Sequence, residues 1–420
     1  MSKSTTEEGN DESQEPPGQP TAQAPLWWER PDLHYSKDAH TAFFGQACLE
    51  DILIDTGYLP TFVYHPARIA EKVSLLRSVL PGVTILYAVK ANRHPAILEQ
   101  AFRCVDGIDV CSPNEARLAL AGGFTEQQIS YTGTSLSEAD LTFLEEHPAI
   151  HVNADSLSLL RRIGQRCPGR KIGIRVNPEM GLGYRNEPRL VYSGQERPGK
   201  FGLLAEQLPD AMLLANQFQL QINTVHWHVG CGWLNDQLDG MAKILGKAVS
   251  LVSQCPDVEN VNLGGGLGVP FQSDDATLSL ERYAEIVGNA IAERWKIFLE
   301  PGSFLVQDAG VLLTQVNTVE QKRLWIFAGV NAGFNLAMEP VFYGMRLEPF
   351  FLRRPEATRP VMPVTLAGNI NEAHDLLTQD FVMPVPQEGE ALGFLNAGAY
   401  AASMSSNHCM RGDFREVIVS

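Results

Sequence analysis

The chain has 420 residues, of which 44% are hydrophobic and 20% are charged, so it contains enough apolar material for two domains with large cores. The formal net charge of −16 argues against nucleic acid and anionic membrane surfaces as partners. Seven scattered cysteines without a metal-binding pair indicate reduced thiols, so we expect a cytoplasmic protein. No apolar run is long enough to span a bilayer, and no signal peptide is expected.

The first 25 residues are rich in Glu, Ser, Gln and Pro and contain almost nothing that could be buried. This composition predicts a disordered acidic tail over residues 1–25. We expect the next segment, residues 26–59, to join a β domain that lies further along the chain.

From residue 60 to residue 305, short apolar runs alternate with stretches of helical spacing. Strands are predicted at 61–64, 83–89, 105–110, 128–132, 149–153, 171–176, 222–228, 259–263 and 296–300. Helices are predicted between them, for example at 67–77, 235–254 and 280–295. This alternation predicts a parallel sheet with crossover helices. The eight runs from 83 to 300 fit a closed (β/α)8 barrel, although an open doubly wound sheet would give a similar pattern.

Residues 306–420 have a different character. Short strand-like runs at 311–316, 324–328, 360–365 and 415–419 are separated by turn residues, and helical periodicity is scarce. This pattern predicts a second, mostly antiparallel β domain. The expected fold class is therefore α/β, with a barrel followed by a C-terminal β domain.

Lys90 ends an apolar run that has the pattern of a buried strand. Barrel enzymes place their catalytic residues at the carboxyl ends of such strands. A lysine that is short of water there has a lowered pKa and can form a Schiff base with a carbonyl compound. Taken alone, Lys90 would more simply be a lysine at the end of a strand whose side chain reaches solvent. The motifs further along the chain favour the catalytic role instead.

Two later strands end in groups suited to a phosphorylated ring compound. The strand at 259–263 runs into Gly264, Gly265 and Gly266. Consecutive glycines let backbone amides converge on one phosphate, whereas a tight turn needs one glycine or two. Glu300 ends the following strand. A buried carboxylate there needs a partner. That partner could be a protonated ring nitrogen or an arginine, or Glu300 could instead cap a loop.

Further polar side chains interrupt or end other apolar runs. His226 and His228 share one face of a strand, but no third metal ligand of clear spacing accompanies them, so no metal site is expected. A histidine ring can instead stack on a flat cofactor, or it can lie in the core with its nitrogens hydrogen-bonded. Arg175 stands within an apolar run, where a buried guanidinium demands an anion.

A Schiff-base lysine, a glycine loop for one phosphate and a carboxylate for a ring nitrogen together describe a pyridoxal phosphate site. Here the sequence resembles the fold-type III pyridoxal phosphate decarboxylases, which are the diaminopimelate, ornithine and arginine decarboxylase relatives of alanine racemase. The resemblance rests on the short motifs YAVKAN, KFG, HVG, GGG, EPG and GAY and extends over about residues 55–415. It implies a barrel of the alanine racemase type, pyridoxal 5'-phosphate as cofactor and decarboxylation of an amino acid or an amino-acid-derived intermediate.

The same resemblance assigns roles to individual residues. Lys90 resembles the lysine that holds the cofactor as an aldimine, from which the reaction passes through a quinonoid. His228 resembles the histidine that stacks on the pyridine ring, and Glu300 the partner of its nitrogen. The remaining cofactor and substrate positions implied by the motifs are Asp109, Arg175, Cys231, Gly264, Gly265, Gly266, Tyr343 and Tyr400.

Three positions depart from the family pattern. Ser303 replaces an arginine after EPG, and Cys231 replaces a serine after HVG. The segment that one subunit of the family lends to the other's active site reads Asn371-Glu372-Ala373-His374-Asp375 here. It implies a homodimer with shared sites, in which Asn371, Glu372 and His374 are catalytic, and Asn371, Glu372 and Asp375 bind substrate.

Asn371 stands where the family has the cysteine that protonates the product, and an amide cannot replace a thiol as an acid. Lys90 or His374 would then supply the proton. The three departures resemble divergent members from siderophore or other specialised biosynthesis.

Two other functions stay open on the sequence. A racemase would abstract a proton from the substrate without releasing carbon dioxide, and a catalytically degenerate subunit would bind the cofactor without turnover. The substrate itself is not identified, although Arg185, Arg189 and Arg197 could meet its carboxylates.

Overall fold

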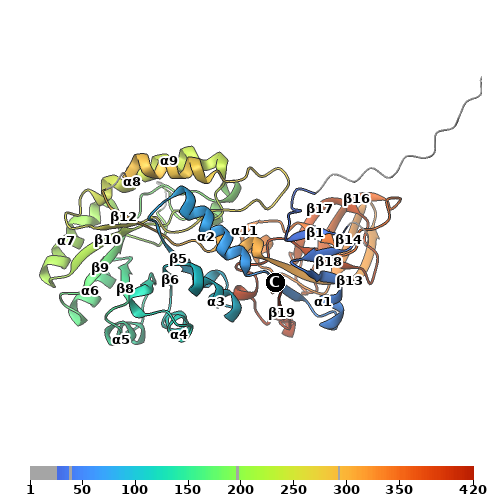
Figure 1. Ribbon diagram of the computed structural model, residues 1–420, viewed down its shortest axis with the longest axis horizontal. Helices are drawn as coiled ribbons and strands as arrows, with labels where there is room; N and C mark the ends of the chain where they lie inside the picture. Colours follow the sequence, from blue (N-terminus) through green and yellow to red (C-terminus); the bar gives the residue numbers. More distant parts are fainter. Residues whose placement is uncertain (1–25, 37–39, 195–197, 292–293) are drawn as a thin grey trace, which may run out of the picture.

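The computed structural model describes residues 26–36, 40–194, 198–291 and 294–420. A barrel surrounded by helices and a domain of strands lie side by side along the long axis of the molecule (Figure 1). The tail predicted for residues 1–25 lies outside the described residues.

Eight parallel strands close into a barrel in the order β10-β11-β12-β5-β6-β7-β8-β9, which confirms the barrel and excludes the open sheet. The strands are buried on both faces because helices cover the outside, and this explains their nearly continuous apolar runs. The barrel strands are β5 (Thr84–Ala88), β6 (Gly107–Val110), β7 (Ile129–Tyr131), β8 (His151–Ala154), β9 (Lys171–Arg175), β10 (Gln221–His226), β11 (Asn260–Asn262) and β12 (Lys296–Leu299).

Helices alternate with these strands. Several begin at serine caps; the side chains of Ser112, Ser137 and Ser156 each accept a hydrogen bond from the backbone N–H three residues further on. Each helix buries an apolar stripe against the barrel, as the spacing predicts. The helices of this part are α2 (Ala67–Val79), α3 (Pro95–Cys104), α4 (Pro113–Ala121), α5 (Glu138–Glu146), α6 (Leu157–Arg166), α7 (Leu208–Gln217), α8 (Leu238–Val252), α9 (Leu280–Ile291) and α10 (Ser303–Val306).

The C-terminal domain is a sheet in which strand pairs are mostly antiparallel, as predicted. Its main path is β15-β18-β13-β14-β16-β17, and the pair β14 and β16 is parallel. The strands are β13 (Gly310–Lys322), β14 (Trp325–Val330), β15 (Pro349–Phe351), β16 (Val361–Ala367), β17 (Leu376–Pro384), β18 (Ala391–Phe394) and β19 (Arg415–Ile418), with the short helix α11 (Glu339–Tyr343) between β14 and β15.

The strand predicted at 61–64 exists as β4 (Thr61–Tyr64), but it does not lie in the barrel. It pairs with β13 and β19 in the C-terminal sheet. Residues 26–59 also pack on this domain: a cluster of apolar side chains joins β1 (Leu33–Tyr35), β2 (Ala42–Phe44) and α1 (Leu49–Asp55) to β13 and β15. A two-residue strand, β3 (Ala47–Cys48), completes the small N-terminal sheet.

The carboxyl ends of the barrel strands face the C-terminal domain. Lys90 lies in the 3-10 turn that follows β5, and Asp109 lies in β6. His228 lies two residues beyond the end of β10, and Glu300 directly follows β12. Parallel strands present their carboxyl ends at the same end of a barrel, so these four residues converge. Across the described part of the chain, no helix combines the length and the apolar character needed to cross a membrane.

Candidate active site

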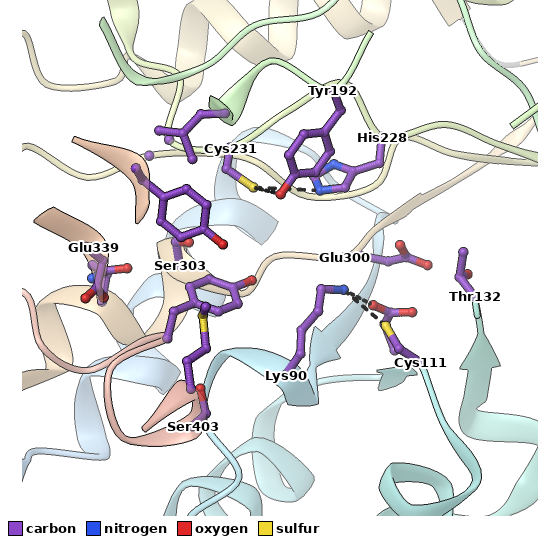
Figure 2. Close-up of a pocket in the computed structure, with 18 of the residues that line it drawn as sticks. Lys90, Cys111, Thr132, Tyr192, His228, Cys231, Glu300, Ser303, Glu339 and Ser403 are labelled. Atoms are coloured by element: carbon purple, nitrogen blue, oxygen red, sulfur yellow. Dashed lines mark hydrogen bonds and ion pairs between the residues drawn. The ribbon is translucent and has the colours of Figure 1, made fainter. Parts of the chain in front are cut away.

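A cavity of about 520 Å³ lies between the barrel and the C-terminal domain. It brings together most of the residues that the sequence predicted (Figure 2). A smaller adjoining pocket shares several of its walls and adds Gly265 and Gly266. The predicted residues that line the main cavity are Lys90, Asp109, Arg175, His228, Cys231, Glu300, Tyr343 and Tyr400.

Lys90 is held by a carboxylate. Its Nζ lies 2.8 Å from Oδ2 of Asp109, and the Cys111 thiol is 3.7 Å away. Burial by itself would lower the pKa of Lys90, but the negative charge of Asp109 outweighs it, and the pKa is raised well above its usual value. The lowered pKa expected from the sequence is therefore wrong, because the sequence did not reveal the carboxylate beside the amine.

Asp109 is itself perturbed. Burial and the nearby charge of Glu300 raise its pKa to about 7, although the Lys90 amine acts in the opposite direction. Its Oδ1 has no hydrogen-bond partner among the described residues. Because this pKa stays below that of Lys90, Asp109 acts as a counter-charge that holds the amine in its protonated form.

Glu300 is buried in a network of hydrogen bonds. His226 Nε2 lies 3.0 Å from Oε2, and Asn262 Nδ2 donates to Oε1 at 2.7 Å. Burial raises the pKa of this carboxyl, but these two donors and the Lys90 charge outweigh it and hold the group ionised. Burial also lowers the pKa of His226, so the imidazole is neutral and acts on Glu300 chiefly through its N–H. The Ser130 hydroxyl is a weaker third donor at 3.4 Å.

His228, Tyr192 and Cys231 form one wall of the cavity (Figure 2). The Tyr192 ring meets the His228 ring edge-on, and its hydroxyl lies 3.1 Å from the Cys231 sulfur. Burial, Arg175 and Lys90 lower the pKa of His228 well below its usual value. A neutral imidazole of this kind can stack against a flat, electron-poor ring.

The glycine loop fits a phosphate group. Gly264 and Gly266 have φ values of +68° and +96°, which favour glycine. The N–H groups of Gly265 and Gly266 make no hydrogen bond within the described part of the chain. Both residues line the small pocket together with Tyr400, whose hydroxyl comes close to Gly302. Two unpaired amides and a tyrosine hydroxyl in one pocket are suited to an anion.

Arg175 ends β9 and lines the cavity, with its guanidinium 4.3 Å from the centre of the Phe201 ring. It makes no ion pair with a described carboxylate, so the anion that the sequence demanded is not a neighbouring side chain. Burial lowers its pKa, and Glu300, Asp155 and Asp109 oppose that effect. With the lysine, the glycine loop and the ionised Glu300, this arrangement fits pyridoxal phosphate.

The segment that carries Asn371, Glu372 and His374 does not line the cavity of its own chain. These three residues are exposed, and the His374 ring lies against Phe334. Asp375 is buried and holds the segment itself: its two oxygens accept hydrogen bonds at 2.7 Å from backbone N–H groups of Phe334 and Ile370. Within one chain, Asp375 is thus a structural residue.

The arginines proposed to meet substrate carboxylates are already paired. Arg185 forms ion pairs with Asp274 and Asp275, and Arg189 with Glu187. Arg197 lies outside the described residues. Several residues of the cavity wall were not predicted from the sequence, including Cys111, Tyr192 and Glu339. Cys111 follows Asp109 by two positions and could have been found, whereas nothing in the local pattern marks the other two.

Comparisons with known proteins agree with this site. The family model of the pyridoxal-dependent decarboxylase, pyridoxal binding domain, matches residues 66–307. The diaminopimelate decarboxylase of Methanothermobacter thermautotrophicus is 31% identical over 407 residues, which cover 93% of this chain and 92% of that protein. The enzyme of the same name from Escherichia coli K12 is 30% identical over 380 residues, which cover 86% and 88%.

Solved structures show the same architecture. The crystal structure of AQ1208 from Aquifex aeolicus has a TM-score of 0.80 and 28% identity, and the match covers 93% of this chain and 92% of that one. Diaminopimelate decarboxylase from Helicobacter pylori, complexed with L-lysine, has a TM-score of 0.79 and 25% identity over 88% and 94% of the two chains. The chain therefore belongs to the pyridoxal-dependent decarboxylases and is a pyridoxal-phosphate-dependent amino-acid decarboxylase, a carboxy-lyase.

Proposed function

We propose that Lys90 is the residue that binds the cofactor covalently and that the cavity around it decarboxylates an α-amino acid. One observation carries this proposal: Lys90 Nζ, the ionised Glu300 and the unpaired amides of the glycine loop all border connected pockets. Pyridoxal phosphate supplies an electrophilic aldehyde and a ring that accepts the electrons left behind when carbon dioxide departs.

The residues of the chain prepare this chemistry. Asp109 accepts a hydrogen bond from Lys90 Nζ and orients it, and the amine acts as a nucleophile once its proton has left. Tyr400 and the amides of Gly265 and Gly266 would hold the phosphate of the cofactor, and His228 would lie against its ring.

Glu300 provides the counter-charge for the ring nitrogen. A carboxylate offers about four lone-pair sites. In Glu300, Oε1 has two donors, Asn262 and Ser130, while Oε2 has His226 alone. One acceptor site on Oε2 is thus free for a protonated ring nitrogen, which strengthens the ring as an electron acceptor.

We also propose that the active form is a homodimer in which Asn371, Glu372 and His374 complete the partner's site. Their exposure in one chain supports this assignment, because a segment that reaches a neighbouring cavity has to project from its own subunit. Lys90, which lies inside the cavity, is the proposed proton donor to the product carbon, since Asn371 has no acidic proton to give.

The changes at Ser303, Cys231 and Asn371 support a substrate other than that of lysine synthesis. Ser303 and Cys231 both line the cavity, so these differences alter its chemistry directly. A role in siderophore or other specialised biosynthesis stays a prediction.

The test is release of carbon dioxide from a panel of α-amino acids by the cofactor-loaded protein, with Lys90→Ala as the control. We expect release with at least one acid and none with the variant. Interconversion of enantiomers without carbon dioxide would identify a racemase, and cofactor binding without any turnover would identify a degenerate subunit.

A further inference from the structure

His228 is a residue of the cavity wall whose ring is not oriented by strong hydrogen bonds. Its Nδ1 is buried and has no hydrogen-bond partner among the described residues, and its Nε2 reaches only the Cys231 sulfur, at 4.0 Å. Burial, Arg175 and Lys90 lower its pKa well below the usual value, so the ring is neutral and no ion pair fixes it. Another contact must therefore set the plane of this ring.

Other histidines of the chain are oriented by a hydrogen bond. His226 Nε2 lies 3.0 Å from Oε2 of Glu300, and His147 Nδ1 lies 2.8 Å from Oε1 of Glu126. A bond of this kind holds an imidazole in one plane, because rotating the ring would break it. His228 differs from both, although it is the histidine that faces the cavity from the position expected to stack on a flat ring.

Tyr192 supplies the missing contact. The centres of the Tyr192 and His228 rings are 5.2 Å apart, and the two ring planes are inclined by 88°. Edge-to-face packing is a preferred geometry for two aromatic rings, and turning either ring out of it loses the contact. Figure 2 shows both side chains together at the cavity wall. The plane of His228 is thus set by a neighbouring ring.

Tyr192 is itself held at both ends. Its backbone N–H donates to the carbonyl oxygen of Val229 at 3.4 Å, next to His228 in the chain. Its hydroxyl lies 3.1 Å from the Cys231 sulfur. On the other side, its ring centre is 5.8 Å from that of Phe201. A ring fixed in this way can hold a second ring in place.

The position of Tyr192 distinguishes it from the tyrosines that pack the core. Tyr87 and Tyr131 are 0% and 1% exposed, and neither lines the cavity. Tyr192 is only half-buried and lines the cavity together with His228. Its contacts therefore shape the wall of the site and do not merely fill the interior of the barrel.

We infer that Tyr192 is a positioning residue, which holds the His228 ring in the plane that stacks on the cofactor, and that Cys231 anchors its hydroxyl. This inference rests on the proposed function, because it takes the cofactor ring to lie against His228. Tyr192 acts through His228 and need not touch the reacting atoms. The inference also gives Cys231, which departs from the family pattern, a role that does not involve the phosphate.

Two probes separate recognition of the ring from recognition of the phosphate. Pyridoxine 5'-phosphate has no aldehyde and cannot react with Lys90, and inorganic phosphate has no ring. Calorimetric titration of the whole chain, freed of cofactor, gives the Kd of each. Tyr192→Leu removes the aromatic edge and should weaken the binding of pyridoxine 5'-phosphate by roughly 2- to 10-fold. The Kd of inorganic phosphate should stay the same.

The His228→Ala background tests whether Tyr192 acts through His228. There, Tyr192→Leu should have no further effect on pyridoxine 5'-phosphate, because the ring that it positions is gone. Tyr192→Phe and Cys231→Ala each remove one side of the hydroxyl–thiol contact, so their effects should not add. Tyr58→Leu is the matched control, since Tyr58 is exposed and does not line the cavity, and it should change neither Kd. Thermal melting establishes that the variants are folded.

The inference is overturned if Tyr192→Leu weakens both probes equally, weakens neither, or has the same effect with and without His228. Additive effects of Tyr192→Phe and Cys231→Ala would overturn the anchoring role of Cys231. Neither probe reacts with Lys90 and no turnover is measured, so the proposed function can fail separately. If no amino acid releases carbon dioxide while Tyr192 and His228 stay coupled, the decarboxylase assignment of the cavity fails and the role of Tyr192 stands.

Discussion

The Nζ of Lys90 lies 2.8 Å from Oδ2 of Asp109, and the two side chains form an ion pair at the wall of the cavity. The pair sets the charge of the amine before the cofactor binds. Because a neutral amine is the nucleophile, the affinity of Lys90 for its proton controls when covalent attachment can occur.

The Asp109→Asn variant should shift the pH dependence of covalent attachment. Asp109 raises the pKa of Lys90, so its removal lowers that pKa. An opposite charge at this distance accounts for about 1–3 pH units, and the midpoint for attachment of pyridoxal to the cofactor-free protein should move down by about that amount. Absorbance titration measures the midpoint. Glu320→Gln, which removes a charge from an exposed position on β13, should leave the midpoint unchanged. An unchanged midpoint in Asp109→Asn would show that the pair does not control the amine.

Replacing Lys90 with alanine should abolish the covalent link. The wild type should absorb in the visible range, and the variant should lose the band of the covalently held cofactor. Borohydride reduction followed by peptide mass analysis should place the added cofactor mass on the peptide that contains Lys90. A label on another lysine would refute this assignment, whatever the activity of the variant.

Glu300→Gln should keep the cofactor and slow the reaction. The amide retains much of the shape of the carboxylate but cannot balance the charge of a protonated ring nitrogen, so turnover should fall by about 100-fold or more. Cofactor content, measured after alkaline denaturation, checks that binding survives. Full turnover with a normal cofactor content would rule out the role proposed for this carboxylate.

A mixture of two inactive variants should recover activity if the sites are shared. Lys90→Ala removes the anchor in one subunit, and Glu372→Ala removes a residue of the projecting segment. Glu372 is preferable to Asp375, because Asp375 holds the backbone of its own segment. A hybrid dimer then contains one intact site, so a statistical mixture should regain about a quarter of wild-type activity. If subunit exchange is proven and the mixture stays inactive, the shared-site dimer is excluded.

Asp308→Asn should weaken the contact between α2 and the start of the C-terminal domain. Asp308 contacts Arg68 at 2.7 Å and Lys72 at 3.0 Å. Its loss leaves Lys72 without a carboxylate partner and Arg68 with only Glu71 and Asp32, which should lower the free energy of unfolding by about 3 kcal/mol at neutral pH. Asp239→Asn breaks an exposed pair with Arg282 and should have little effect.

The effect of Asp308→Asn should depend on pH. Burial raises the pKa of Asp308, but Lys72, Arg68 and Arg30 outweigh it and lower the pKa below its usual value. The wild type therefore binds fewer protons when folded at acid pH, and the stability from Asp308 is lost as the pH falls below about 4. Urea unfolding at several pH values should show the wild type and the variant converging there. A constant difference down to pH 3 would contradict the electrostatic origin.

Local patterns in the sequence determined much of this protein. Alternating strands and helices indicated the parallel barrel because burial on both faces forces apolar runs, and each helix needs one apolar stripe. Lys90, the glycine loop and Glu300 could be located because each follows a strand, and parallel strands present their carboxyl ends together. The short motifs then identified the pyridoxal phosphate chemistry.

Tertiary structure decided the features that depend on contacts between distant segments. The local pattern of β4 suits either domain, and its pairing with β13 and β19 placed it in the C-terminal sheet. The charge of Lys90 depends on Asp109 in a neighbouring strand, so the direction of its pKa shift could not be read from its own strand. Glu339 carries no local signal at all. Its burial at the cavity wall is a property of the packed molecule and not of any single segment.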